Sequence, residues 1–290
     1  MSPARQAVLI SALAGLAFLG LRSLPDTRCA FLHADHAPVV AGGVEFCGVD
    51  EEANFYSPRA LKFPVQLEVG LAPDRVTGTM RLLGEDGRPI PAHEIAVSHT
   101  RQVHLHLRQV TGRVGYVHVH PEPAEDGSWR FVLPDSFATG NPGGRIEAYV
   151  DFVRVRSAQV QLAETTVELP MLHMAPSSRK SRNVVKSVTL SSTRTGESAW
   201  LRVALAAPAG SPPLKLGPLM GSLGHAVLFR VGPDQAGYLH MHPSLEGGEF
   251  GPDPTLSFRL RLPAPGRYDL WVHIADGAED YLHVPLEVTP

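Results

Sequence analysis

Charged residues are scarce in this sequence, and neither sign of charge dominates. Asp, Glu, Lys and Arg make up 19% of the 290 residues, and the formal net charge at pH 7 is −3. Such a chain has no overall field that would draw it to nucleic acid or to an anionic membrane surface. Hydrophobic residues nevertheless make up 43% of the chain, which is enough for a packed core. We therefore expect a folded protein with no nucleic-acid partner.

Cysteine is almost absent, since Cys29 and Cys47 are the only two in the chain. In an oxidising compartment these residues can form a disulfide, provided that Cys29 survives any removal of the N-terminus. If Cys29 is removed, Cys47 is left as a lone thiol. The sequence leaves both alternatives open.

The motifs of common hydrolases and phosphate-binding enzymes are missing as well. His93 and His99 are six residues apart in a β-leaning stretch, whereas a zinc-protease motif needs two histidines four apart on a helix. The segment Met220–Gly224 lacks the glycine two positions before the serine that a nucleophile elbow requires. No glycine-rich phosphate-binding loop is present. We predict a protein that is not an enzyme, although histidines around a metal with an open position could still support metal-assisted chemistry.

The first thirty residues differ in composition from the rest. A basic start precedes the uninterrupted apolar run Ala7–Leu21, which is the layout of a secretory signal peptide and falls short of the ~20 residues that span a bilayer comfortably. The candidate cleavage site before Phe31 is poor, because Arg28 stands where a small residue is needed. We expect residues 1–30 to be a cleaved signal peptide or an uncleaved anchor in the inner membrane through residues 7–21. The remainder is then exported to the periplasm.

One seven-residue string occurs twice, as GYVHVHP from Gly115 and as GYLHMHP from Gly237. When the two strings are aligned, the flanking apolar residues, turn residues and histidines also match, which indicates an internal duplication. Asp151 aligns with His273, and either residue could supply a further ligand to a metal. The other matched positions of interest are His99 with Met220, His104 with His225, His118 with His240, and His120 with His242.

The predicted secondary structure is almost entirely β-strand. Apolar and polar residues alternate with period two in runs such as Arg145–Val150 and Ser257–Leu262, with turn signals between them. The 27 glycines and 26 prolines supply those turns. We expect an all-β protein with two tandem Ig-like or cupredoxin-like β-sandwich domains that arose by duplication. The expected boundaries are an extended segment at 31–58, domain 1 at 59–170, a linker at 171–184 and domain 2 at 185–290.

The chain is rich in histidine, with 14 residues. Because residues i and i+2 of a strand share a face, His118 and His120 point one way while Val117 and Val119 point into the core. We therefore expect the histidines on the outer face of each sandwich or in a groove at its rim. One His-x-His pair is common on an exposed polar face, and a duplicated structural string would also persist without any metal.

Histidines of the preceding strand are expected to face this pair. Neighbouring side chains of an antiparallel pair lie ~5 Å apart, so three or four imidazoles can converge on one zinc or copper ion. The ring nitrogens of His104 and of His118 or His120 should then lie within ~4–5 Å of each other. A thioether at Met220 would favour Cu(I). The candidate ligands are His99, His104, His106, His118 and His120 in domain 1, and Met220, His225, His240 and His242 in domain 2.

These strings resemble a domain of bacterial envelope proteins. HTRQVHLHL, GYVHVHP, DGSWRF and GGRIEAYVDF are similar to that domain's run of His-x4-His-Leu, aromatic-x-His-x-His-Pro and Gly-x-Tyr strand. In the second half, LGPLMGSLGHAVLFR, YLHMHP and PGRYDLWVHI resemble a sister form in which a Gly-His pair replaces His-x4-His. The resemblance covers most of residues 60–290. The family is similar to domains of proteins that handle heavy metals, copper above all, in the cell envelope.

The resemblance implies a β-sandwich with a metal site and no established catalytic activity. His106 is an extra histidine that the family pattern does not require. The positions that carry over are His99, His104, His118 and His120 in the first half, and His225, His240 and His242 in the second.

Three functional hypotheses follow from these observations. The first is an exported, non-catalytic metal-binding protein, with copper favoured over zinc, for sequestration, delivery or sensing of the ion in the envelope. The second is an Ig-like module that contacts an envelope protein partner and whose histidine clusters are structural. The third is a subunit of a metalloenzyme.

Overall fold

The chain divides into two compact units, Met1–Leu32 and His33–Pro290. The two cysteines lie outside the described residues, as do residues 171–182 of the predicted linker and most of the predicted segment 31–58. The computed structural model describes residues 2–22, 39–41, 44–46, 52–54, 64–74, 76–110, 115–134, 137, 144–169, 183–194, 196–232, 237–245 and 248–288.

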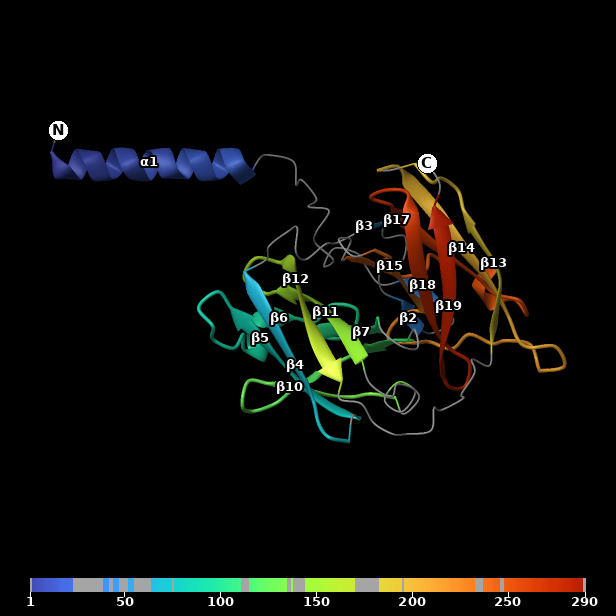
Figure 1. The fold of residues 1–290 in the computed structure, drawn as a ribbon. Helices are drawn as coiled ribbons and strands as arrows, with labels where there is room; N and C mark the ends of the chain where they lie inside the picture. The colour runs from blue at the N-terminus through green and yellow to red at the C-terminus, as the bar shows by residue number, and fades with distance from the viewer. Residues whose placement is uncertain are drawn as a thin grey trace. The chain divides into compact units, whose positions relative to one another are not determined.

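The described residues of the first unit form the helix α1 (Pro3–Arg22), of 20 residues (Figure 1). Its window Pro3–Gly20 has a mean hydropathy of 1.4, and none of that window is buried. At 1.5 Å per residue α1 is about 30 Å long, which matches the hydrocarbon core of a bilayer. Length and composition therefore fit a membrane anchor, and they fit a signal sequence equally well.

The second unit is all-β, as predicted, and begins with short strands followed by a first sandwich. One of its sheets has the order β4-β5-β10-β9, the other has the order β12-β11-β7-β8, and β6 pairs with β11. The strands are β4 (Val65–Leu71), β5 (Thr77–Gly84), β6 (Ile95–Ala96), β7 (Val103–Gln109), β8 (Gly115–Val119), β9 (Glu122–Pro123), β10 (Trp129–Val132), β11 (Gly144–Arg154) and β12 (Gln159–Leu169).

A second sandwich repeats this arrangement. Its sheets have the orders β13-β14-β17-β3 and β16-β15-β18-β19, so that β16-β15-β18-β19 corresponds strand for strand to β8-β7-β11-β12. His104 pairs with Asp151 across β7 and β11, and His225 pairs with His273 across β15 and β18, which is the correspondence that the alignment of the repeats predicts. The strands are β13 (Val184–Leu190), β14 (Ser198–Ala206), β15 (His225–Arg230), β16 (Tyr238–Met241), β17 (Thr255–Arg261), β18 (Gly266–Ala275) and β19 (Glu279–Val288).

Short elements complete the described part of the second unit. The strand β3 (Glu52–Asn54) pairs in parallel with β17, although it precedes the first sandwich in the chain. It takes the sheet position that β9 holds in the first sandwich. The remaining elements are the hairpin β1 (Val39–Ala41) and β2 (Val44–Phe46), and the 3-10 turns η2 (Ala92–Glu94) and η3 (Gly248–Phe250).

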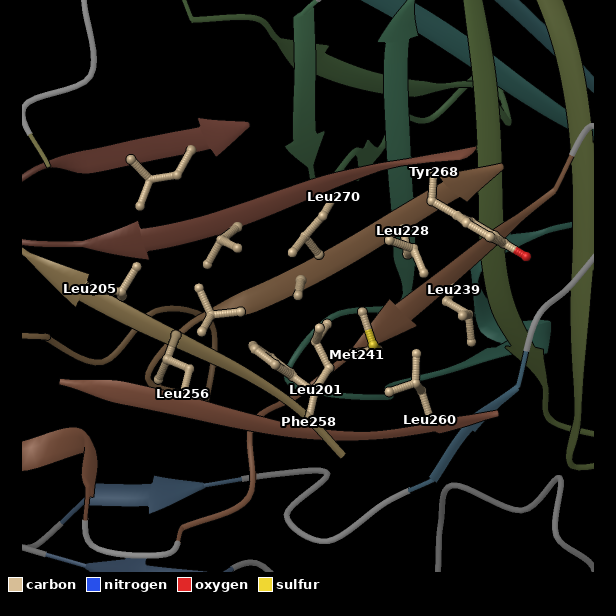
Figure 2. Packing of buried hydrophobic residues seen from close by; sticks show 14 of the residues in the cluster. Leu201, Leu205, Leu228, Leu239, Met241, Leu256, Phe258, Leu260, Tyr268 and Leu270 are labelled. Carbon is tan, nitrogen blue, oxygen red and sulfur yellow. The ribbon is translucent and has the colours of Figure 1, made fainter. Parts of the chain in front are cut away.

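Each sandwich has its own apolar core, because one face of every strand carries the apolar residues of the period-two pattern. In the second sandwich, Leu201 and Leu205 of β14 meet Leu228 of β15 and Leu270 of β18 between the two sheets (Figure 2). The first sandwich has a separate core, in which Met80, Leu82 and Trp129 are almost fully buried.

A third apolar cluster joins the two sandwiches and was not predicted. Its members lie on strands of the β12-β11-β7-β8 sheet and of the β16-β15-β18-β19 sheet, so these two sheets pack face to face. Arg108 also reaches across, with its Nη2 atom 2.6 Å from Oδ2 of Asp269. We call this cluster the aromatic interface; it consists of Tyr116, Tyr149, Val160, Leu162, Val227, Phe229, Tyr238 and Trp271.

The turns that precede β7 and β15 share an uncommon backbone conformation. In the first, φ is 50° at His99 and 71° at Thr100; in the second, φ is 53° at Met220 and 78° at Gly221. Positive φ is unfavourable for any residue with a Cβ atom, and most of all for a β-branched one such as threonine. Thr100 therefore carries backbone strain that the glycine at the equivalent position avoids.

Replacement of Thr100 by glycine is expected to stabilise the protein. A residue with a side chain pays roughly 1–2 kcal/mol in the left-handed region, and the entropy of the glycine offsets roughly 0.5–1 kcal/mol of that gain. We expect T100G to raise the free energy of unfolding by about 0.5–1 kcal/mol and G221T to lower it by at least as much. Urea unfolding of both variants measures the difference; a loss of stability in T100G would show that the turn is not strained.

Candidate metal centre

The histidines of β7 and β8 lie on the outer face of the first sandwich, and the second sandwich covers that face. Val103 and Leu105 of β7 point into the core, while His104 and His106 alternate with them. His104 is 1% exposed, His106 0% and His118 2%. The sequence placed these side chains correctly on the outer face, but it did not reveal that this face is buried.

Histidines from both repeats form a single group, which we call the histidine cluster. The ring centroids of His118 and His225 are 5.4 Å apart, and those of His106 and His240 are 4.8 Å apart. The separate clusters expected in each domain are therefore one centre at the contact between the two sandwiches. Its members are His99, His104, His106, His118, His120, His225, His240, His242 and His273.

Three imidazoles of the first repeat converge on one point. The Nδ1 atom of His104 lies 3.3 Å from Nε2 of His118 and 3.1 Å from Nε2 of His120, which confirms the expected approach. On its other side, Nε2 of His104 lies 3.0 Å from the carbonyl oxygen of Ser98. Because a carbonyl oxygen only accepts, Nε2 carries the proton and Nδ1 presents a lone pair to the two other rings.

These distances also fit nitrogens that share one metal ion. Metal–nitrogen bonds of about 2.0–2.1 Å in tetrahedral geometry place the ligand nitrogens roughly 3.3 Å apart. The carbonyl of Ser98 also supplies the outer hydrogen bond that metal-bound histidines almost always make through their second nitrogen. We call His104, His118 and His120 the first triad.

The repeat-equivalent residues form a second triad, His225, His240 and His242, whose ligand atoms all lie within 4.8 Å of one another. His225 is 1% exposed, and both of its ring nitrogens are buried without a hydrogen-bond partner, as is Nε2 of His240. Leaving buried polar atoms unpaired costs about 1–3 kcal/mol each. Such atoms in a native structure call for a ligand, and a metal ion satisfies a bare imidazole nitrogen.

Three groups of potential ligands cross between the repeats, and two of them do not include His106. One consists of His118, His225 and His273, and the other of His104, Asp151 and His240; in each, the ligand atoms lie within 4.8 Å of one another. The duplication relates these two groups to each other, because each member of one aligns with a member of the other. The centre therefore has an approximate two-fold symmetry in which Asp151 and His273 are equivalent.

His273 has an outer partner of its own. Its Nε2 atom lies 3.1 Å from Oε2 of Glu279, so Nε2–H donates to the carboxylate and Nδ1 is left with a lone pair, buried and without a hydrogen-bond partner. Its ring also stacks on Tyr281, with centroids 4.0 Å apart, and the Tyr281 hydroxyl donates to the carbonyl oxygen of His118 over 3.2 Å. A carboxylate that holds the second nitrogen is a common support for a metal-bound histidine.

His106 has a hydrogen-bond partner at each of its two ring nitrogens. Its Nε2 lies 3.1 Å from Oδ2 of Asp151, and its Nδ1 lies 2.8 Å from the hydroxyl oxygen of Tyr116. The carboxylate can only accept, so Nε2–H donates to Asp151, and Nδ1 accepts from Tyr116. His106 is within ligand distance of His118 and His240, but both of its nitrogens are already in hydrogen bonds. We interpret it as a residue that positions Asp151 rather than as a ligand.

Asp151 is held ionised beside the histidines of both repeats. Burial by itself would raise the pKa of Asp151, but the hydrogen bond from His106, the nearby His104 and the hydroxyl of Tyr238 outweigh it and lower the pKa to about 2. Tyr238 donates to Oδ2 of Asp151 over 3.0 Å. Aspartate is thus present as a carboxylate, the form that binds a metal.

Five histidines of the cluster have a lowered pKa, which favours their neutral form. Burial lowers the pKa of His118, His225, His240 and His273, and lowers that of His120 to about 2. The other imidazoles of the cluster lower the pKa of His118, His225 and His240 further, because a proton on one ring repels a proton on the next. Neutral imidazole is the form that ligates a metal.

A surface cavity leads to one edge of the centre. It has a volume of about 890 Å³, and His120 forms part of its wall together with Glu122, Glu125, Asp126 and Arg130. The three acidic side chains are exposed. His120 is therefore the member of the first triad that lines a cavity open to solvent.

Two predicted ligands remain beside the triads. His99 stacks on His242 of the other repeat with centroids 4.1 Å apart, but no three-residue ligand group found among the described residues includes it. Met220 occupies the equivalent turn position and is half-buried. The supporting residues Tyr116, Tyr238 and Glu279 were not predicted, although the conserved place of both tyrosines in the repeat was a signal.

Comparison with known proteins gives one family match. Residues 181–289 match the model of a domain of unknown function, DUF8832. No curated protein matches.

Solved structures resemble the chain weakly. A tetra-tandem repeat from the extending region of a large adhesion protein has 10% identity and a TM-score of 0.24, with 77% of this chain and 48% of that chain covered. Dimeric latent PorU from Porphyromonas gingivalis has 10% identity and a TM-score of 0.20, with 73% and 21% covered. The chicken interferon gamma receptor alpha chain has 12% identity and a TM-score of 0.22, with 79% and 98% covered. The chain thus spans about half the length of the first structure.

Proposed function

We propose that this chain is an exported, non-catalytic protein that binds a transition-metal ion between its two sandwiches, for sequestration, delivery or sensing in the cell envelope. The observation that carries this proposal is the convergence of the first triad, in which Nδ1 of His104 faces two imidazole nitrogens at 3.1 and 3.3 Å. The apolar helix α1 supports export or anchoring. The resemblance of the histidine strings to copper-handling envelope domains supports the location and the metal.

Copper is favoured over zinc for this centre. Imidazole binds both ions, but the affinity of a nitrogen site for divalent metals rises to copper and falls again at zinc. Six of the nine members of the histidine cluster are buried, and His99, His120 and His240 are half-buried. Such an enclosed site suits holding an ion more than turning over a substrate. An Ig-like interaction module would not require three ring nitrogens to face one another.

The test is metal binding by the full-length chain, purified without a polyhistidine tag. Near neutral pH we expect stoichiometric copper by elemental analysis, and H104A should weaken copper affinity by at least about 100-fold, since even outer-shell changes cost 10–100-fold. H93A is the matched control, because His93 is exposed on η2, and its affinity should stay unchanged. Circular dichroism checks that each variant is folded. Absence of stoichiometric copper or zinc, or equal binding by folded H104A, would overturn the proposal.

A further inference from the structure

The two triads share no residue. His104, His118 and His120 all belong to the first repeat, and the three residues of the second triad all belong to the second repeat. Each triad alone offers three nitrogens, which is the usual number of protein ligands in an open metal site. Duplication has therefore doubled the number of ligand sets, even though the sandwiches bring all six histidines into one cluster.

The triads are also direct neighbours. His118 of the first triad belongs to one ligand group with His225 and to another with His240, and His104 belongs to a group with His240. In each of these pairs the ligand atoms are within 4.8 Å of each other. Two ions, one on each triad, would consequently lie side by side rather than in separate pockets.

Asp151 and His273 lie between the triads. Asp151 is grouped with His104 of the first triad and with His240 of the second, and His273 is grouped with His118 of the first and His225 of the second. Both residues thus reach a ligand from each triad, and the pseudo-two-fold relation places them on opposite sides of the centre. A carboxylate between two cations also offsets part of their mutual repulsion.

We propose that the centre holds two metal ions, one on His104, His118 and His120 and the other on His225, His240 and His242, with Asp151 placed to contact both. This inference rests on the proposed metal-binding function. It accounts for all the cross-repeat ligand groups by one arrangement, except the group that contains His106, whose nitrogens are already hydrogen-bonded. It also gives one of the two unpartnered nitrogens of His225, and the unpartnered Nε2 of His240, an ion to bind.

The experiment loads the full-length, untagged chain with Cu(II) and compares the copper content with the electron paramagnetic resonance signal. We expect two copper ions per chain, and an integrated spin well below the copper content, because two adjacent Cu(II) ions couple magnetically. H120A and H242A each remove one ligand of one triad, at positions that follow the strand ends. Each variant should keep one copper, and its signal should account for all of that copper. H93A should behave as the unaltered chain.

The outcomes separate this inference from the proposed function. One copper per chain with a full signal would contradict the two-ion centre and leave the metal-binding function standing. Two coppers with a full, uncoupled signal would show two distant sites and would also contradict it. Loss of all copper from a correctly folded H120A or H242A would mean that the triads form one indivisible site, which overturns the inference as well. No copper in the unaltered chain would instead overturn the proposed function itself.

Discussion

Metal-free protein is expected to unfold, or to lose contact between its sandwiches, when the pH falls from about 7.5 to about 5.5. Burial lowers the pKa of His118, His120, His225, His240 and His273 in the folded state below the ordinary value near 6.5. In the unfolded chain the same side chains take up protons as soon as the pH drops below about 6.5. The unfolded state then binds more protons than the folded state, so acid favours unfolding.

The expected effect is large because five buried histidines act together. Lowering the pH by one unit below an unfolded pKa of about 6.5 costs roughly 1.4 kcal/mol for each histidine that stays neutral in the folded state. The four whose pKa is lowered furthest, His118, His120, His225 and His240, sum to about 6 kcal/mol, which is comparable to the whole stability of 5–15 kcal/mol of a typical domain. Asp151, with a pKa of about 2, works in the same direction but only at lower pH, from about 4 downwards.

Thermal melts followed by circular dichroism between about pH 7.5 and pH 5 would measure this dependence. Copper should shift the acid transition to lower pH, because ligation requires the neutral imidazoles and competes with protons. H93A is the control, since His93 is exposed and its removal should leave the profile unchanged. A melting temperature that is nearly constant over this range would mean that the cluster is hydrated or rearranged in solution.

Much of this architecture could be predicted from the sequence. Alternation with period two is a local property of each strand. On β8 it was enough to predict that Val117 faces the core and that His118 points outward. The alignment of the repeats predicted which residues are equivalent, and the pairs His104–Asp151 and His225–His273 do occupy matched positions in their sheets. The short distance between the ring nitrogens of His104 and His120 was predicted from the expected antiparallel pairing of neighbouring strands.

The contact between the sandwiches could not be predicted, since it depends on long-range packing of two faces that each look polar in sequence. The aromatic residues of these faces alternate with histidines: Tyr116 precedes His118 by two positions, as Tyr238 precedes His240. A face with this pattern is predicted to be exposed to solvent as long as the sheet that packs on it is not known. The hydrogen bonds of His106 to Asp151 and Tyr116 were not predicted for the same reason, because these partners meet it only in the folded sheet.

Replacement of His225 by leucine is expected to stabilise the metal-free protein while removing metal binding at the second triad. His225 is 1% exposed, and neither ring nitrogen has a hydrogen-bond partner. Leucine has a similar volume and carries no polar atom, so H225L should raise the free energy of unfolding by about 1–3 kcal/mol. The stabilisation by copper should shrink in H225L, because a ligand of the folded state is gone. Urea unfolding with and without copper measures both effects.

The matched control is the same substitution at His106, which is 0% exposed but fully hydrogen-bonded. H106L would remove the acceptor of the Tyr116 hydroxyl, which lies 2.8 Å from Nδ1 of His106. It would also remove the imidazole that donates to Asp151 over 3.1 Å. Leaving buried partners unpaired costs about 1–3 kcal/mol each, and more for a charged group, so H106L should be destabilised by at least 2 kcal/mol or so. Two buried histidines of one cluster thus respond to leucine with opposite signs. Equal destabilisation of H225L and H106L would show that His225 already has a partner in the metal-free protein, and that its nitrogens are not held open for an ion.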